Sequence, residues 1–305
     1  MDIKENVPLA PLTTFKIGGS ARYFVDVRTE EEIRGALQWA KEKNIRFVVL
    51  AGKSNVLVPD EGIDALVIHI VEGSWSFNDG LLSADAGCNL LTLIRGASEQ
   101  GMSGWEKLAG IPGTLGGAVR GNAGAFGPEI KDFVIKIHVL HTETGEIREF
   151  GNFQCEFSYR MSHFKLHPEW IIIRVWLKLE KVDPKASERL IDETIKEREK
   201  RHIQNVQAAG SFFVNPVVPK EIQEMFEKER GVKAREGRVP AGWLIEKVGL
   251  KGARVGDAVA SEQHPNYLKN DGKATAAQVK ELARKIKDAV RTEFSIELDE
   301  EAVVL

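Results

Sequence analysis

The sequence predicts a two-lobed protein of the α/β type. Three observations lead to this prediction. The chain has 305 residues, which is enough for two domains. Helix-like and strand-like patterns alternate through its first 200 residues, and the pattern changes after that point. Because 43% of the residues are hydrophobic and 29% are charged, the composition is that of a soluble globular protein.

Net charge, cysteine content and hydropathy indicate where the protein works and which classes of partner are excluded. A net charge of −3 argues against a nucleic-acid binder that works by bulk charge. Cys88 and Cys155 lie far apart without metal or redox spacing, which favours a reducing compartment. The first residues lack the pattern of a signal peptide, and no apolar run reaches the ~20 residues needed to cross a bilayer. We therefore expect a cytoplasmic protein with no nucleic-acid or membrane partner.

The first predicted unit is β-α-β. Residues 21–27 are apolar and read as a strand, and residues 46–50 read as a second, buried strand. Between them, residues 30–43 place their apolar side chains on one helical face. Thr29 followed three residues later by Glu32 forms a capping box, which predicts the start of this helix.

The loop at residues 51–58 follows the second of these strands. Ligands commonly bind beyond the carboxyl ends of strands in such units, so we expect a ligand-binding loop here. The tripeptide Gly52-Lys53-Ser54 resembles the end of a P-loop, but a P-loop requires glycine where this chain has Phe47. A P-loop is therefore excluded.

The remaining elements follow from periodicity and turn residues. Further strands are expected at 65–71, 81–86, 133–141, 146–150 and 170–180, with 133–141 and 146–150 forming a hairpin. Helices are expected at 89–100 and 183–200. Beyond a domain boundary near residue 200, we expect helices at about 219–230, 240–248 and 275–293, and a closing strand at 294–298.

The most informative stretch is residues 108–127, LAGIPGTLGGAVRGNAGAFG, here called the glycine-rich segment. It has seven glycines between residues 110 and 127, interspersed with apolar residues, unlike a polar Gly/Ser linker. Dense glycine is typical of backbone that takes positive φ or closely approaches a ligand. The spacing does not fit the G-x-G-x-x-G dinucleotide fingerprint. We expect a loop whose N–H groups bind an anion, such as the phosphates of a cofactor.

Three side chains stand out as candidates for chemistry. Ser211 lies between a glycine and two phenylalanines, and is either a buried, hydrogen-bonded serine or a reactive hydroxyl. Arg160 lies among aromatic residues and either binds a carboxylate or phosphate or is a surface arginine with a packed stem. Glu301 belongs to an acidic run, which is most often a solvated face. Each alternative stays open at this point.

Basic residues and histidines give weaker signals. Lys251 and His264 either meet an anion or are ordinary surface residues. His138 and His141 lack the spacing of a same-face pair on a strand, and His163 and His167 have no third partner nearby in sequence. We expect no metal site.

Seven motifs in this order resemble the UDP-N-acetylenolpyruvoylglucosamine reductase family of peptidoglycan precursor synthesis. They are LTTFKIGG, AGKSNVLV, the glycine-rich segment, CEFSYRMSHFK, AAGSFFVNP, VPAGWLIEKVGLKG and LDEEAVVL. The resemblance covers nearly the whole chain, and its most specific parts are the glycine-rich segment and AGSFF-x-NP.

The resemblance implies an α+β fold with FAD as cofactor. An FAD-binding domain of the vanillyl-alcohol-oxidase type would occupy residues 1–200, with subdomains at about 1–70 and 71–200. A C-terminal α+β substrate-binding domain would occupy residues 201–305, and its last strand would pack back on the FAD lobe. We expect the protein to act as a monomer.

The resemblance also assigns residues. Arg160, Ser211 and Glu301 fall on the family's catalytic positions, and Tyr159, Asn215, Lys251 and His264 fall on substrate-binding positions. The residues implied for FAD come from two loops: Ala51, Gly52, Lys53, Ser54, Asn55, Val56, Gly110, Pro112, Gly113, Thr114, Gly116, Gly117, Asn122, Ala123 and Gly124.

The implied reaction reduces an enol ether. NADPH would reduce FAD, and a hydride would then pass to the enolpyruvyl group of UDP-N-acetylglucosamine enolpyruvate, giving UDP-N-acetylmuramate. Ser211 would donate a proton, and Arg160 and Glu301 would stabilise the developing enolate. Two alternatives are an oxidase or dehydrogenase that shares the flavin fold, and a nucleotide-binding module without enzymatic activity.

Three departures from the family pattern are visible. Ala51 and Lys53 stand where the family usually has glycine, and Lys53 either tolerates the backbone there or contacts phosphate itself. Val214 stands where many relatives have lysine. Residues 161–210 contain no tyrosine, so the chain resembles the shorter family type, which lacks a substrate-capping tyrosine.

Overall fold

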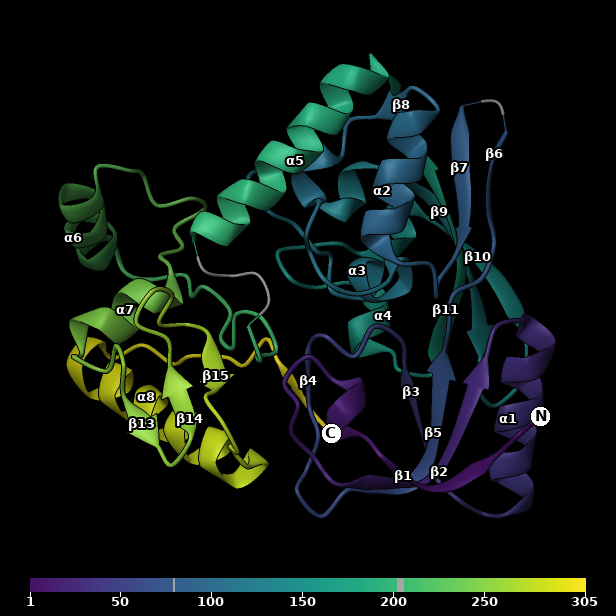
Figure 1. The fold of residues 1–305 in the computed structure, drawn as a ribbon. Coiled ribbons are helices and arrows are strands. Elements are labelled where there is room, and N and C mark those ends of the chain that lie inside the picture. Colours follow the sequence, from purple (N-terminus) through teal and green to yellow (C-terminus); the bar gives the residue numbers. More distant parts are fainter. Residues whose placement is uncertain (79, 202–205) are drawn as a thin grey trace. The chain divides into compact units, whose positions relative to one another are not determined.

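The computed structural model describes residues 1–78, 80–201 and 206–305. The chain divides into two units, each with its own packing (Figure 1). The first unit consists of Met1–Val7, Ala21–Lys53 and Asp64–Lys200, and the second of Pro8–Ser20, Ser54–Ile63 and Arg201–Leu305. Largely antiparallel sheets combined with separate helices confirm the α+β class that the resemblance implies.

The first unit contains a four-stranded sheet of order β1-β2-β5-β3, in which β3 and β5 are parallel. Its strands are β1 (Lys4–Pro8), β2 (Ser20–Val27), β3 (Phe47–Leu50) and β5 (Ile63–Ile70). Helix α1 (Glu30–Glu42) begins at the capping box of Thr29 and Glu32, as the sequence predicts. It buries Ile33 in a core with Val25 of β2 and Ile68 of β5.

The second sheet of this unit is antiparallel, with the order β10-β9-β11-β7-β6. Its strands are β6 (Trp75–Asn78), β7 (Leu81–Asp85), β9 (Val134–His141), β10 (Ile147–Gly151) and β11 (Trp170–Lys178). The pairing of β9 with β10 confirms the expected hairpin. The short strands β8 (Met102–Ser103) and β12 (Glu180–Lys181) pair separately.

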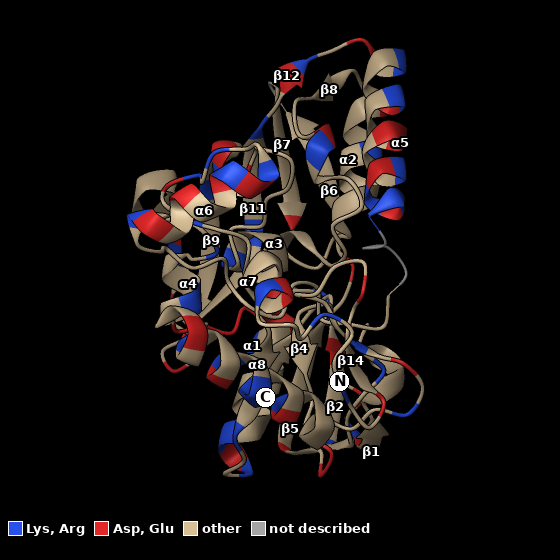
Figure 2. Cartoon of the chain, turned by 90° about the vertical axis from the view of Figure 1, so that its left-hand side faces the viewer, with Lys and Arg blue, Asp and Glu red and all other residues tan. Residues whose placement is uncertain are grey.

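Helices cover this second sheet and complete its core. They are α2 (Leu90–Glu99), α3 (Leu115–Arg120), α4 (His163–Leu166) and α5 (Pro184–Lys200), with 3-10 turns η2 (Glu106–Leu108), η3 (Ile130–Asp132) and η4 (Asn152–Cys155). Trp105 and Leu93 are fully buried in this core. Helix α5 lies beside α2, and the colouring of the ribbon in Figure 2 shows acidic and basic residues alternating along α5, as expected for a partly solvated helix.

In its described residues, the second unit combines three α-helices and a 3-10 turn with short strands. Its elements are η1 (Ala10–Leu12), β4 (Val56–Leu57), α6 (Lys220–Arg230), α7 (Ala241–Lys247), β13 (Arg254–Val255), β14 (Ala258–Ala260), β15 (Leu268–Asn270), α8 (Ala276–Phe294) and β16 (Val303–Val304). Strand β16 pairs in parallel with β4. Phe15 and Leu57, from the N-terminal part of the chain, share a core with Phe212, Trp243 and Ile286.

One predicted element is wrong. Residues 294–298 do not form the closing strand, because α8 continues to Phe294 and Ser295 ends it in the left-handed conformation, with φ of 55°. Ile296 and Leu298 are buried, so the alternation that suggested a strand reflects packing of an extended segment without strand pairing. The expected FAD-binding and substrate-binding domains stay a prediction, since the two units are defined by packing and not by ligands.

Candidate active site

The glycine-rich segment uses its glycines for two purposes. Gly110 and Gly113 have φ of 79° and 118°, which side chains rarely allow. Gly116 is buried in α3, and a Cβ there would lie 2.7 Å from the Cβ of Ala86. Thr114 caps α3 by accepting a hydrogen bond from the N–H of Gly117, at 3.4 Å. The segment is therefore a turn that leads into a closely packed short helix.

The two loops expected to bind the cofactor meet in the first unit. A Cβ on Gly52 would lie 2.5 Å from the Cα of Gly113 and 3.0 Å from the backbone nitrogen of Thr114. Only glycine permits this contact between backbones. The first loop therefore lies directly on the glycine-rich segment, with no side chain between them. This fits a group that is held by backbone N–H groups, such as the pyrophosphate of FAD.

Asn122 ties the end of this segment to its neighbours. The residue is fully buried and takes a φ of 42°. Its amide nitrogen donates to a Glu129 carboxylate oxygen at 2.9 Å and to the Ser158 carbonyl at 2.8 Å, and its amide oxygen accepts from the N–H of Lys131. The Asn122 side chain thus bonds within the protein and ties the glycine-rich segment to residues 129–131 and to Ser158.

Arg160 lies against the glycine-rich segment, in the same unit. It takes a φ of 57° in the tight turn between Ser158 and Met161. Its guanidinium donates to the carbonyl of Gly124 at 2.8 Å and lies over the Tyr159 ring, 4.9 Å from the centroid. The structure therefore brings both sequence-predicted residues, Tyr159 and Arg160, to the predicted cofactor loop.

Ser211 and Glu301 are neighbours in the second unit. The N–H of Glu301 donates to the carbonyl of Phe212 at 2.8 Å, and Phe213 and Glu300 form an antiparallel bridge. Ser211 follows Gly210, which has a φ of 75°, and precedes two buried phenylalanines. The backbone pairing thus holds the serine and the glutamate on adjacent extended segments.

Asn266 is a positioning residue that sequence reasoning missed. Its side chain is buried; the oxygen accepts from the N–H of Phe213 at 2.9 Å, and the nitrogen donates to the carbonyl of the same residue at 2.8 Å. Its own carbonyl accepts from the N–H of Phe212. Asn266 therefore binds the N–H and the carbonyl of Phe213 and the N–H of Phe212, the two residues that follow Ser211. No local sequence signal points to Asn266, because its partners lie 53 residues away.

Three residues expected at the cofactor lie in the second unit. The side-chain amide of Asn55 donates to the carbonyl of Glu301 at 3.0 Å, and Val56 pairs with Val303. The carbonyl of Ser54 accepts from the Thr14 hydroxyl, which also donates to the carbonyl of Ala208. These contacts support the segments that carry Ser211 and Glu301.

Three of the four expected substrate contacts, Asn215, Lys251 and His264, lie in the second unit, and Tyr159 lies in the first. Asn215 accepts a hydrogen bond from the N–H of Ala241, at the start of α7, and Lys251 is exposed. His264 is largely enclosed and packs against Tyr267 with 4.6 Å between ring centroids. Burial lowers the pKa of His264, and its Nδ1 has no partner among the residues that the structure describes. Near pH 7 the His264 ring is thus neutral.

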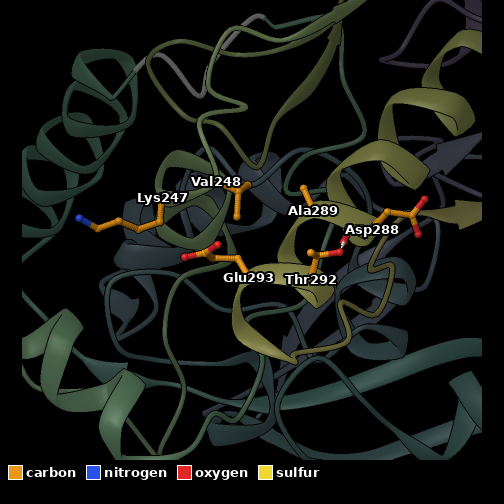
Figure 3. Close-up of a pocket in the computed structure, with 6 residues that line it drawn as sticks. All are labelled: Lys247, Val248, Asp288, Ala289, Thr292 and Glu293. Atoms are coloured by element: carbon orange, nitrogen blue, oxygen red, sulfur yellow. Dashed lines mark hydrogen bonds between the residues drawn. The ribbon is translucent and has the colours of Figure 1, made fainter.

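A surface hollow between α7 and α8 is unrelated to these residues. Figure 3 shows its lining by Lys247, Val248, Asp288, Ala289, Thr292 and Glu293, none of which the sequence analysis singles out. Within the described ranges, no cluster of acidic, histidine and cysteine side chains is arranged to hold a metal ion. None of the helices described is long and apolar enough to span a bilayer.

Comparisons with protein families match both parts of the chain. A family model described as UDP-N-acetylenolpyruvoylglucosamine reductase, C-terminal domain, matches residues 201–305. A model described as an FAD binding domain matches residues 21–151. The second match includes the loop at Gly52 and the whole glycine-rich segment.

Individual relatives match over almost their full length. A UDP-N-acetylenolpyruvoylglucosamine reductase of Solibacter usitatus is 34% identical, over 98% of this chain and 95% of the relative. One from Pseudomonas putida is 36% identical, over 98% of this chain and 97% of the relative. The crystal structure of UDP-N-acetylenolpyruvylglucosamine reductase from Thermus caldophilus superposes with a TM-score of 0.78, at 34% identity and 99% coverage of both chains.

Proposed function

The chain belongs to the UDP-N-acetylenolpyruvoylglucosamine reductase family, and from this premise we propose that it is an NADPH-dependent flavoenzyme of peptidoglycan precursor synthesis. Its substrate is UDP-N-acetylglucosamine enolpyruvate, and its product is UDP-N-acetylmuramate. We propose that it works in the cytoplasm as a monomer. The observation that carries the proposal is the full-length match to relatives of this name, combined with the paired placement of Ser211 and Glu301.

The residues that hold FAD come from the two loops that meet at Gly52 and Gly113. Bound FAD supplies two-electron transfer as a hydride, which NADPH provides and the enolpyruvyl double bond accepts. The protein binds the phosphates through backbone N–H groups, which carry no charge that would have to be desolvated. Because Gly52 has no side chain, the backbones of the two loops are in contact. This contact supports the proposal that both loops bind the same FAD molecule.

Ser211 acts as the proton donor in this proposal. Hydride addition to the terminal carbon of the enolpyruvyl group leaves a carbanion on the adjacent carbon, delocalised into the carboxylate, and a proton must reach that carbon. A serine is a weak acid in water, so its contribution depends on fixed placement beside a strongly basic enolate. Asn266 supplies such placement by holding Phe212 and Phe213.

Arg160 and Glu301 stabilise the enolate. A guanidinium and a protonated carboxyl group both donate hydrogen bonds to an oxyanion, which is most effective where water is excluded. Glu301 is aligned by its backbone bond to Phe212 and by Asn55, which binds its carbonyl. Tyr159, Asn215, Lys251 and His264 contact the nucleotide-sugar part of the substrate in this proposal.

The first test is a visible spectrum of the purified protein before and after anaerobic addition of NADPH. We expect flavin absorption that bleaches with NADPH and recovers when UDP-N-acetylglucosamine enolpyruvate is added. Recovery only in air would instead support an oxidase with the same fold. A colourless protein that does not take up FAD would contradict the proposal.

A further inference from the structure

Three side chains behind the first cofactor loop form a continuous chain. Lys53 follows β3, and its ammonium contacts Nε2 of His69 on β5. Nδ1 of His69 lies 2.6 Å from a carboxylate oxygen of Asp26 on β2. Because β5 lies between β3 and β2, the three side chains run across the sheet and link the loop after β3 to strand β2.

The geometry fixes the proton positions along this chain. Burial lowers the pKa of His69, so the ring is neutral near pH 7. Nδ1 donates its proton to Asp26, which leaves the lone pair of Nε2 to accept from the ammonium of Lys53. The charged groups that face the ring are Asp26 on β2 and Lys53 after β3, and the Phe24 ring packs 5.6 Å from it.

Lys53 needs such support because of its backbone. Its φ is 51°, a left-handed conformation that a side chain disfavours and that surroundings must hold in place. The preceding residue is Gly52, whose contact with Gly113 joins the two cofactor loops. A change of backbone at Lys53 would therefore move the loop off the glycine-rich segment.

We propose that Lys53 is a positioning residue of the cofactor site, held by His69 and Asp26, and that it acts through the backbone of residues 51–53 and not as a phosphate ligand. A glycine here would take the left-handed backbone without a partner, whereas the lysine of this chain has an anchor. The inference rests on the proposed function, because it takes FAD as the ligand of this loop.

The experiment measures the dissociation constant of FAD from the full-length apoprotein, by quenching of flavin fluorescence near pH 7.5. Lys53→Met keeps the strained backbone without the ammonium, and His69→Leu removes the acceptor. We expect each to bind FAD about tenfold more weakly, as for loss of one charge-assisted hydrogen bond. Lys53→Gly removes both the strain and the need for an anchor, so we expect it to bind within about twofold of the unaltered protein.

Two further variants sharpen the result. In the Lys53→Gly background, His69→Leu should have no added effect on FAD binding, because the histidine then has nothing to anchor. His138→Gln is a matched control, since His138 is half-buried on β9 and also pairs with a carboxylate, that of the exposed Glu149, which binds Lys136 as well. It should bind FAD as the unaltered protein does. Circular dichroism checks that each variant is folded.

The inference also gives a pH dependence. When His69 is protonated, its Nε2 can no longer accept from Lys53, and the two cations repel each other. Because the pKa of His69 lies below its ordinary value of 6.5, FAD affinity should be constant near neutrality and fall at more acidic pH. Lys53→Gly should lack this acidic loss.

Two outcomes overturn the inference. If Lys53 binds phosphate directly, His69→Leu frees its ammonium and tightens FAD binding, while Lys53→Gly weakens it. If neither Lys53→Met nor His69→Leu alters the dissociation constant, the chain of three side chains has no role in the site. In both cases FAD still binds and the proposed function stands, whereas failure of the unaltered apoprotein to bind FAD at any pH overturns both.

Discussion

Arg160 shows how single residues shape the candidate site. Its guanidinium donates to the carbonyl of Gly124, so a backbone group of the glycine-rich segment holds the cation. Asn122 ties the same stretch to the same turn, through its bond to the carbonyl of Ser158. Two polar side chains, one from the neighbouring turn and one within the segment, thus hold this stretch of small residues in place.

The role of Ser211 gives a selective prediction. Ser211→Ala removes the proposed proton donor and leaves the cofactor loops of the first unit intact. We expect NADPH to bleach the flavin at the normal rate, and the enolpyruvyl substrate to restore it ~10²-fold more slowly. Stopped-flow absorbance separates the two half-reactions.

The control for this experiment is Ser76→Ala, at an exposed position of β6. Both half-reactions should be unchanged in this variant. Equal losses in both half-reactions of Ser211→Ala would mean that Ser211 supports the structure and does not donate the proton.

At this scale the sequence reveals residues of unusual type but not their partners. Ser211 and Arg160 stand out because glycine and aromatic neighbours make them unusual. Asn266 does not stand out, although it holds the backbone next to Ser211. Thr14 bonds to a carbonyl 194 residues away, and no local pattern encodes such a contact.

At the scale of elements, α8 depends on a residue from a distant loop. A carboxylate oxygen of Asp60 accepts from the N–H of Ala276 at 2.7 Å, and the other accepts from Ala277 at 3.0 Å. Thr275 caps the same helix with its hydroxyl. The first turn of α8 is therefore held by its own cap and by a negative charge near its positive end.

Asp60→Ala should loosen this first turn. We expect the free energy of local opening to fall by about 1 kcal/mol. Water can take the place of the Asp60 carboxylate as acceptor of the Ala276 and Ala277 N–H groups, but it does not supply the negative charge. Amide exchange of a peptide covering residues 276–294 should become roughly fivefold faster, as measured by mass spectrometry. Asp64→Ala is the control. The Asp64 side chain is 79% exposed in its ion pair with Arg22, so its removal should change the amide exchange of residues 276–294 little. Unchanged exchange in Asp60→Ala would refute this role.

Elements with a local start signal are the ones that the sequence predicts well. Helix α1 begins at its capping box, and the β9–β10 hairpin follows its turn residues. Helix α3 was not predicted, because glycine disfavours helices and the reason for Gly116 is its close packing on Ala86. The C-terminal strand lies at Val303–Val304 and not at residues 294–298, since β16 forms by pairing with β4, which is far away in sequence.

At the scale of the whole molecule, the described residues form separate hydrophobic cores in the two units. The cofactor contacts proposed at Gly52 and Gly113 belong to the first unit, so FAD should stabilise mainly that unit. At a free concentration of 100 times its dissociation constant, a ligand adds about 2.7 kcal/mol. We expect calorimetry to show an increase of about 5–10 °C in the melting temperature of one transition.

Riboflavin is the control for this measurement, because it contains the flavin ring without the pyrophosphate or the adenosine. At the same concentration it should raise the melting temperature much less than FAD. An equal increase with both compounds would mean that the two loops do not bind phosphate.

The division into units is the part of the fold that the sequence does not reveal. Residues 8–20 and 54–63 pack with the C-terminal part of the chain, although they lie within the N-terminal run of strands. Phe15 and Leu57 bury these segments in the core of the second unit. The sequence shows that both residues are apolar, but it does not show which core an apolar residue joins.

This interleaving has a consequence for folding during synthesis. Domains usually fold as units while the ribosome extends the chain, N-terminal part first. Here Phe15 and Leu57 emerge early, but the core that buries them also needs Ile286, and β4 needs Val303 as its strand partner. Two N-terminal segments must therefore stay exposed until translation is nearly complete, and a fragment expressed from residue 201 onward would lack part of its own core.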